Sequence, residues 1–222
     1  MSKPAAQSRE GQLKITEIFY SLQGEARDAG RPSVFIRLTG CPLRCVYCDS
    51  EYAFYGGEWM DIDHIIEQVA AYRTPHVCVT GGEPLAQKRC HELLKRLCDA
   101  GYDVSLETSG AIDVSRVDRR VSRVLDIKTP GSGEQARNLW ENLDVLTRHD
   151  QVKFVICSRD DYEWALAEVR ARGLEEKLDI LFSPAWRQVK PMHLADWVLQ
   201  DRLNVRVQLQ LHKLLWGDVP GK

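Results

Sequence analysis

Apolar residues along this chain fall into short runs separated by polar and glycine-rich segments. The runs are rich in Val, Ile, Leu and Phe, which favour strands, especially strands buried on both faces. This pattern predicts strands over residues 13–20, 33–38, 76–80, 102–107, 124–128, 152–157, 178–182 and 204–209.

Between the strands, apolar residues recur at the three- and four-residue spacing of a helix. Ile62, Ile65 and Val69 share one face of a helix that Asp61 would cap. A second helix runs from Cys90 to Cys98, with Gly101 at the position favoured after a helix end. Further helices are predicted over residues 135–146, 160–172 and 192–203, and a weak one over 114–121.

Alternation of strands and helices predicts an α/β fold with a mostly parallel sheet and helices outside it. About six strand–helix units are too few for a closed eight-fold barrel, so we expect a partial, open β/α barrel. No linker or repeat divides residues 13–222, which we expect to form a single domain. Residues 1–12 are polar and predict a disordered tail.

Composition narrows the class of protein. Among 222 residues the net charge is -2, so no strongly basic balance predicts nucleic-acid binding. No apolar run approaches the roughly 18 residues that span a membrane, and the start lacks the apolar stretch of a secretory signal. Seven cysteines, an odd number, fit a reducing cytoplasm better than a disulfide framework.

Three of the cysteines, Cys41, Cys45 and Cys48, stand in a C-x3-C-x2-C pattern. Three thiolates can hold three corners of a [4Fe-4S] cluster and leave one iron open to a small molecule, whereas four would close it. A zinc module is the alternative, but structural zinc takes four ligands, usually in two pairs. Here no second pair exists, and His64 or a remote cysteine would have to complete the site.

Chemically distinctive residues follow the ends of several predicted strands. The cysteines follow the strand at 33–38, and the later groups are residues 80–84, 107–110, 126–128 and 208–212. Because the carboxyl ends of parallel strands meet at one edge of a sheet, we expect these groups to share a site there.

The cysteine pattern, with Tyr47 before the third cysteine and Gly-Gly-Glu-Pro at 81–84, resembles the radical S-adenosylmethionine (SAM) enzymes. The resemblance implies that SAM binds the open iron beside Cys48 and Asp49. It also implies that Gly82 and Glu83 receive the SAM ammonium group and that Tyr47 lies against adenine. The segment Asp126, Ile127, Lys128 matches further SAM contacts, although the family often has serine where this chain has Asp126.

Residues 17–25, ending in Leu-Gln-Gly-Glu, resemble the opening motif of the 7-carboxy-7-deazaguanine synthases. Arg37 and the ending Gln-Leu-His-Lys at 210–213 extend this likeness over nearly the whole chain. The resemblance implies 6-carboxy-5,6,7,8-tetrahydropterin as substrate, converted to 7-carboxy-7-deazaguanine by radical ring contraction with loss of ammonia, a step toward queuosine. The implied substrate contacts are Leu22, Gln23, Gly24, Arg37, Thr80, Glu107 and His212.

The same resemblance implies a magnesium ion bound by Ser50, where the family usually has threonine, and Ala26 stands where it often has glycine. It further implies a homodimer and a flavodoxin or ferredoxin as electron donor. The alternative within the superfamily is a small glycyl-radical activating enzyme, whose substrate would be a protein. Such an enzyme has no evident use for the turn at 22–25 or for Arg37.

Overall fold

The computed structural model describes residues 11–219 and residue 221. A nine-stranded sheet, in the order β3-β1-β2-β4-β5-β6-β7-β8-β9, runs through the whole of this part. Its strands are β1 (Gln12–Leu22), β2 (Pro32–Leu38), β3 (Glu58–Asp61), β4 (His76–Gly81), β5 (Asp103–Thr108), β6 (Ser122–Ile127), β7 (Gln151–Ile156), β8 (Asp179–Pro184) and β9 (Arg206–Val207).

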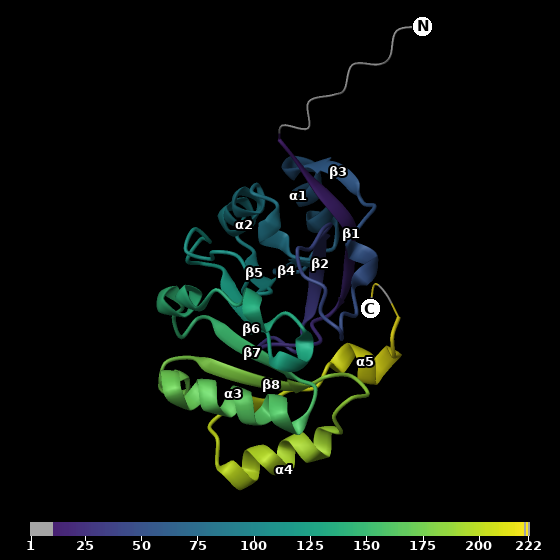
Figure 1. The fold of residues 1–222 in the computed structure, drawn as a ribbon. Coiled ribbons are helices and arrows are strands. Elements are labelled where there is room, and N and C mark those ends of the chain that lie inside the picture. Colours follow the sequence, from purple (N-terminus) through teal and green to yellow (C-terminus); the bar gives the residue numbers. More distant parts are fainter. Residues whose placement is uncertain (1–10, 220, 222) are drawn as a thin grey trace, which may run out of the picture.

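Neighbouring strands from β2 to β9 are parallel, whereas β1 is antiparallel to both β2 and β3. The two ends of the sheet, β3 and β9, do not pair with each other. The barrel is therefore open, as the number of strand–helix units predicted (Figure 1).

The helices α1 (Ile62–Ala71), α2 (Cys90–Asp99), α3 (Arg159–Arg172) and α4 (Pro191–Asp201) lie in the connections between parallel strands. Each places an apolar stripe in the core between helices and sheet, which leaves the opposite sheet face free for polar groups. Ser158 caps the start of α3 by accepting a hydrogen bond from the Asp161 backbone N–H. Gly173, in the left-handed conformation, ends that helix.

Two predicted helices are wrong. Residues 114–121 form turns because the Asp113 and Asp118 carboxylates accept the backbone N–H groups of Ser115 and Arg120 two residues on. The segment 135–146 contains only short 3-10 turns, Gln135–Arg137 and Trp140–Val145. Between them, the Asn138 side chain bonds both backbone groups of Lys128 at 2.8 and 2.9 Å, and the chain there is extended.

The ends of the chain also differ from expectation. Gln12, predicted to lie in the tail, opens β1, and the other tail positions 1–10 lie outside the described residues. The strand expected over 204–209 is reduced to the two residues of β9, and a helix not predicted, α5 (Leu211–Trp216), follows it. One continuous sheet runs through the described residues, and the single domain expected over residues 13–222 stays a prediction.

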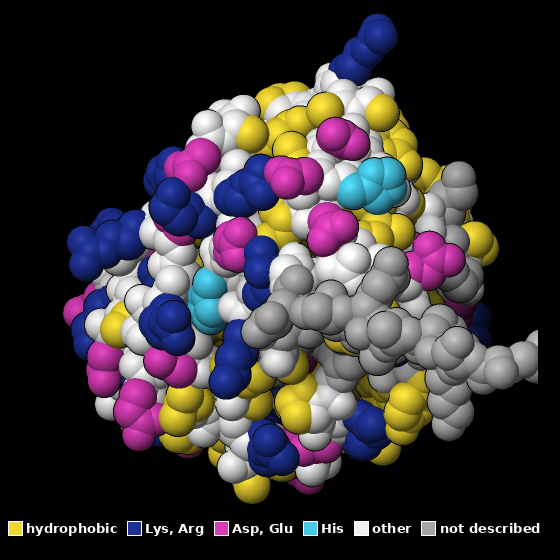
Figure 2. Space-filling model, turned by 90° about the horizontal axis from the view of Figure 1, so that it is seen from above, with side chains coloured by type: hydrophobic (Ala, Val, Ile, Leu, Met, Phe, Trp, Pro, Cys, Tyr) yellow, Lys and Arg dark blue, Asp and Glu magenta, His cyan; other side chains and the backbone are white. Residues whose placement is uncertain are grey.

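In the described part of the chain, no helix has the length and apolar character needed to cross a membrane. On the face shown in Figure 2, basic and acidic side chains are interspersed. The described residues on that face thus present no broad field of one sign.

Candidate active site

The cysteine loop leaves β2 and lies across the carboxyl edge of the sheet. Its three cysteines are free, partly exposed thiols. Burial raises the pKa of Cys41, and it raises the pKa of Cys45 to about 11, so a bound cation is needed to make these groups thiolates at neutral pH. Among the described residues, no three His, Cys, Asp or Glu side chains converge as ligands of a single metal ion.

Gly81 and Gly82 allow the end of β4 to pack directly against this loop. A Cβ atom on Gly82 would stand 2.8 Å from Cys41 Cβ and would also overlap the Gly40 carbonyl oxygen. The neighbouring Glu83 N–H donates to that same carbonyl at 2.8 Å. Close backbone approach therefore explains why glycine stands at 82, and Gly82 itself lines the cavity.

Two residues expected to bind SAM, Glu83 and Ile127, do not line the cavity described below. Glu83 is fully buried, and its carboxylate accepts hydrogen bonds from Thr108 Oγ1 at 3.0 Å, Ser109 N at 2.6 Å and Leu85 N at 2.9 Å. It is thus engaged with protein donors away from the cavity wall. Ile127 belongs to the apolar core, because strand alternation turns it away from the face that carries Asp126.

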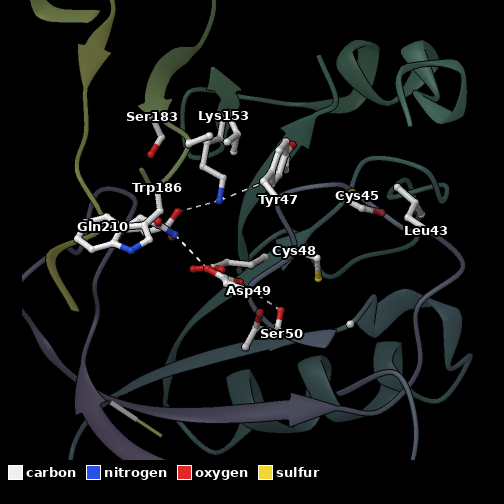
Figure 3. Close-up of a pocket in the computed structure, with 18 of the residues that line it drawn as sticks. Leu43, Cys45, Tyr47, Cys48, Asp49, Ser50, Lys153, Ser183, Trp186 and Gln210 are labelled. Atoms are coloured by element: carbon white, nitrogen blue, oxygen red, sulfur yellow. Dashed lines mark hydrogen bonds and ion pairs between the residues drawn. The ribbon is translucent and has the colours of Figure 1, made fainter. Parts of the chain in front are cut away.

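A cavity of about 490 Å³ opens between the cysteine loop and the strand ends. In Figure 3, the loop residues Cys45, Tyr47 and Cys48 lie on one side and Lys153, Ser183 and Gln210 on the other.

On the cofactor side of this cavity, Lys128 Nζ lies 3.1 Å from Asp126 Oδ2 and 5.6 Å from the centre of the Tyr47 ring. Tyr47 OH and Asp126 Oδ1 are both buried, and neither finds a hydrogen-bond partner among the described residues. Since buried polar atoms are normally satisfied, this pair fits a ligand that brings hydroxyl or amino groups.

A smaller cavity of about 80 Å³ adjoins the first, and the turn after β1 forms part of its wall. Arg37, Thr80 and Glu107 line both cavities. The remaining residues predicted to bind substrate line the smaller one: Leu22, Gln23, Gly24 and His212. The turn and α5 touch closely, since a Cβ on Gly24 would overlap the His212 ring.

Arg37 is held in place by contacts of its guanidinium group with one carboxylate and two aromatic rings. Its Nε donates to Glu17 Oε1 at 2.7 Å, and the Phe19 and Tyr52 rings lie 5.8 and 5.7 Å from Cζ. Its two Nη groups form no hydrogen bond within the described part of the chain. A carboxylate arriving from the cavity could engage this free edge.

Glu107 and His212 are both biased toward their neutral forms. Burial raises the pKa of Glu107, despite the nearby cations Lys153 and Arg37. Gln23 Nε2 donates to this carboxyl group at 3.3 Å. Burial likewise lowers the pKa of His212. The smaller cavity therefore places two groups whose neutral forms are favoured by burial beside the charged Arg37.

Three further residues line the cavity without having been predicted to bind cofactor or substrate: Lys153, Gln210 and Lys213. Of these, Gln210 belongs to the group at 208–212 that we expected at this edge of the sheet. Lys213 Nζ contacts Asp49 Oδ2 at 2.8 Å, and the pKa of Asp49, which burial alone would raise, is lowered by this lysine to about 2. Gln210 Nε2 donates to Glu25 Oε1 at 2.9 Å and Asp49 Oδ2 at 3.2 Å. Lys153 was recognisable only as one cation inside an otherwise uncharged strand.

Ser50 also lines the main cavity, next to Asp49. Its hydroxyl lies 3.4 Å from Asp49 Oδ1. An oxygen ligand is therefore available between the cysteine loop and the smaller cavity, in which Asp49 also takes part.

Comparison with known proteins agrees with this geometry. Residues 35–182 match the family model of the radical SAM superfamily. The 7-carboxy-7-deazaguanine synthase of Chlorobaculum tepidum is 46% identical over 95% of this chain and 97% of its own. That of Koribacter versatilis is 45% identical over 92% and 97%.

Solved structures resemble the fold as well. The crystal structure of QueE from Escherichia coli superposes with a TM-score of 0.74 at 25% identity, covering 94% of this chain and all of that one. Streptococcus suis SuiB bound to S-adenosylmethionine shares the fold alone, with a TM-score of 0.54 at 14% identity over 77% of this chain and 45% of its own. The chain therefore belongs to the 7-carboxy-7-deazaguanine synthase family of the radical SAM superfamily.

Proposed function

We propose that this protein converts 6-carboxy-5,6,7,8-tetrahydropterin to 7-carboxy-7-deazaguanine by radical ring contraction with loss of ammonia. The observation that carries the proposal is the junction of two cavities. The cysteine loop lines one, the turn at Leu22–Gly24 lines the other, and Arg37 is shared between them. A radical source and a pterin could thus occupy adjoining cavities that share part of their lining.

At the cofactor end, Cys41, Cys45 and Cys48 would hold a [4Fe-4S] cluster. When bound, the cluster and SAM supply the electron transfer and bond cleavage that yield a carbon radical able to take hydrogen from substrate. Tyr47 and Asp126 offer their buried unpartnered oxygens to the SAM ribose or amino group. Lys128, held by Asp126, compensates the charge of that carboxylate within the wall.

At the pterin end, the free edge of Arg37 would bind the substrate carboxylate. Thr80 and the carboxyl group of Glu107, whose pKa burial raises, would hydrogen-bond the ring. Leu22, Gln23 and Gly24 would cover the ring against water, with neutral His212 behind them. These residues bind and orient; the radical chemistry belongs to the cofactor.

We further infer that Ser50 provides a ligand to Mg²⁺, shared with substrate oxygens. The hydroxyl lies in the cavity wall, and hard cations prefer such oxygen ligands. A flavodoxin or ferredoxin as electron donor and a homodimer are proposed from the family likeness alone, and a cytoplasmic location from the cysteine usage.

The glycyl-radical activating enzyme considered as an alternative is not favoured. Its substrate would be a protein, whereas the relatives over nearly the full length are 7-carboxy-7-deazaguanine synthases. The turn before Glu25 closes a cavity of only about 80 Å³, a size suited to part of a small molecule.

The test is an anaerobic assay with reconstituted, reduced protein, SAM and carboxytetrahydropterin. We expect 7-carboxy-7-deazaguanine by mass spectrometry, formed faster with Mg²⁺. Cleavage of SAM without that product would disprove the synthase assignment and leave the superfamily intact. If a Ser50→Ala variant responds to Mg²⁺ as the wild type does, Ser50 is not a ligand of the metal. Ser50→Thr, which keeps the hydroxyl group, is the matched control.

A further inference from the structure

Lys153 is a buried cation between two carboxylates that belong to different parts of the site. It projects from β7 into the cavity, where its Nζ lies 2.8 Å from Glu25 Oε2 and 3.5 Å from Asp126 Oδ2 (Figure 3). The residue is 8% exposed. Among the described residues, only Lys153 forms an ion pair with Glu25, and it shares Asp126 with Lys128.

The first partner, Glu25, is the last residue of the turn that lines the smaller cavity. Its backbone N–H donates to Gln23 Oε1 at 3.2 Å, and Gln23 in turn donates to Glu107. Gln210, at the start of α5, donates to the other Glu25 oxygen at 2.9 Å. Through Glu25, Lys153 is therefore connected to the wall proposed to bind the pterin.

The second partner, Asp126, is paired directly with Lys153 in the β6–β7 register. Its Oδ2 contacts both lysines, its Oδ1 is buried without a partner in the described residues, and the residue lines the main cavity. Through Asp126, Lys153 is connected to the wall proposed to bind SAM. One side chain thus spans the boundary between the two proposed binding sites.

Electrostatic attraction stabilises the ion pairs of Lys153 with Glu25 and Asp126. Burial would raise the pKa of Glu25, yet the charge and hydrogen bond of Lys153 hold it below its usual value. Burial would lower the pKa of Lys153, but Glu25, Asp126 and Glu107 together raise it well above its usual value. Without the lysine, Glu25 would lose its ion-pair partner inside the protein, and such an uncompensated charge moves or takes up a proton.

We propose that Lys153 is a positioning residue that fixes the pterin wall relative to the SAM wall, and so sets the distance over which substrate hydrogen is removed. This inference rests on the proposed function. Lys153 transfers no proton in this role; it holds Glu25 and Asp126 in place. A displacement of about 1 Å in reacting groups can lower a rate roughly 100-fold. Loss of Lys153 should therefore separate SAM cleavage from product formation.

The test compares Lys153→Met, Lys153→Arg and, as a matched control, Lys95→Met, whose lysine is exposed on α2 and pairs with Asp99. Two quantities are measured on folded, cluster-loaded protein. The first is the ratio of 5′-deoxyadenosine to 7-carboxy-7-deazaguanine formed. The second is the Kd of carboxytetrahydropterin by anaerobic calorimetry without reductant, where no turnover occurs.

For Lys153→Met we expect the ratio to rise about 10- to 100-fold and the Kd to rise about tenfold. Lys153→Arg keeps the charge and should recover part of both, and Lys95→Met should match the wild type. A Lys153→Met protein with wild-type ratio and Kd overturns the proposal. So does a variant that only unfolds more readily while its folded fraction keeps both values, because that marks a purely structural role.

If Lys153→Met does not fold, Glu25→Gln tests the same connection with a side chain of equal size. We expect a raised ratio in this variant, and an unchanged ratio overturns the proposal. The wild type separates this inference from the proposed function. If the wild type forms no 7-carboxy-7-deazaguanine, the proposed function is wrong. If it forms the product and the variants keep the wild-type ratio of 5′-deoxyadenosine to product, only the proposed role of Lys153 is wrong.

Discussion

The strands β6 and β7 carry two buried charge clusters, one at each end, and the clusters are built differently. At the amino end, Arg123 donates to both carboxylate oxygens of Asp150, through Nε at 2.8 Å and Nη2 at 2.7 Å. Asp150 also accepts the backbone N–H groups of Arg123 and Thr147. The whole cluster is closed: each oxygen of this carboxylate has protein donors.

At the carboxyl end, Asp126, Lys128 and Lys153 form a looser cluster, with contacts of 3.1 and 3.5 Å. Here Asp126 Oδ1 has no partner among the described residues, and the cluster faces a cavity rather than a loop. The same two strands thus carry a fully hydrogen-bonded buried ion pair at one end. At the other end they carry polar groups that line a cavity. Buried charge alone does not mark a functional site; unsatisfied buried charge beside a cavity does.

The largest effect expected at the carboxyl end comes from Cys45→Ala. With two cysteines left, the cluster should not be retained, so iron should fall from about four per chain and product formation should cease. Iron analysis and the anaerobic assay measure both, with Cys98→Ala on α2 as the control. Retained activity in Cys45→Ala would contradict the cluster assignment.

At the amino end, Asp150→Ala should affect stability instead of chemistry. Removing one partner leaves Arg123 buried and unpaired, which typically costs about 3–5 kcal/mol. Denaturant unfolding should show this loss, while the folded fraction makes product at a rate near that of the wild type. A large drop in activity per folded molecule would break the distinction between the two ends.

Asp126→Asn should give the opposite result. Asparagine keeps the size but weakens both lysine contacts and changes the oxygen offered to SAM. We expect about a 10- to 100-fold loss of product with little change in unfolding free energy. Near-normal turnover in a destabilised variant would instead show that this cluster, like the Arg123–Asp150 pair, serves stability.

The contribution of Asp150 to stability at the amino end should depend on pH. Burial would raise the pKa of Asp150, but Arg123 and the backbone donors lower it below its usual 3.8. A lowered folded-state pKa contributes stability above pH 3.8, which is lost as the pH falls through the folded value. The stability difference between wild type and Asp150→Asn should therefore shrink below about pH 3.8. A difference that stays constant with acid would refute this linkage.

The smallest effect concerns the turn beside Glu25. Ala26 has φ of +63°, a conformation that glycine adopts without strain, and the Gln208 side chain holds it at 2.7 and 2.8 Å. Ala26→Gly should raise the unfolding free energy by about 0.5–1 kcal/mol, because relief of strain outweighs added chain entropy. Ala29→Gly in the same turn is the control. A destabilised Ala26→Gly would show that the turn tolerates alanine.

The class of fold and the cysteine ligands at one end of the site could be predicted from the amino-acid sequence. Buried β-branched runs alternating with amphipathic stretches allow few arrangements other than a parallel sheet with outer helices. Cysteine spacing is local, so three ligands within eight residues could be recognised without knowing the fold. The turn at 22–25 and Arg37 could be identified because they form motifs along the chain.

Which polar groups meet could not be predicted, because their pairing depends on how distant segments fold together. Lys153 and Glu25 are 128 residues apart in the chain, and Lys213 reaches Asp49 from α5, a helix that periodicity did not predict. Long-range packing also overrode local preference at Asn138, whose amide binds the Lys128 backbone in place of extending a helix. Local patterns fix periodicity and short spacing, whereas the pairing of buried charges depends on strand order and on the burial that makes pairing necessary.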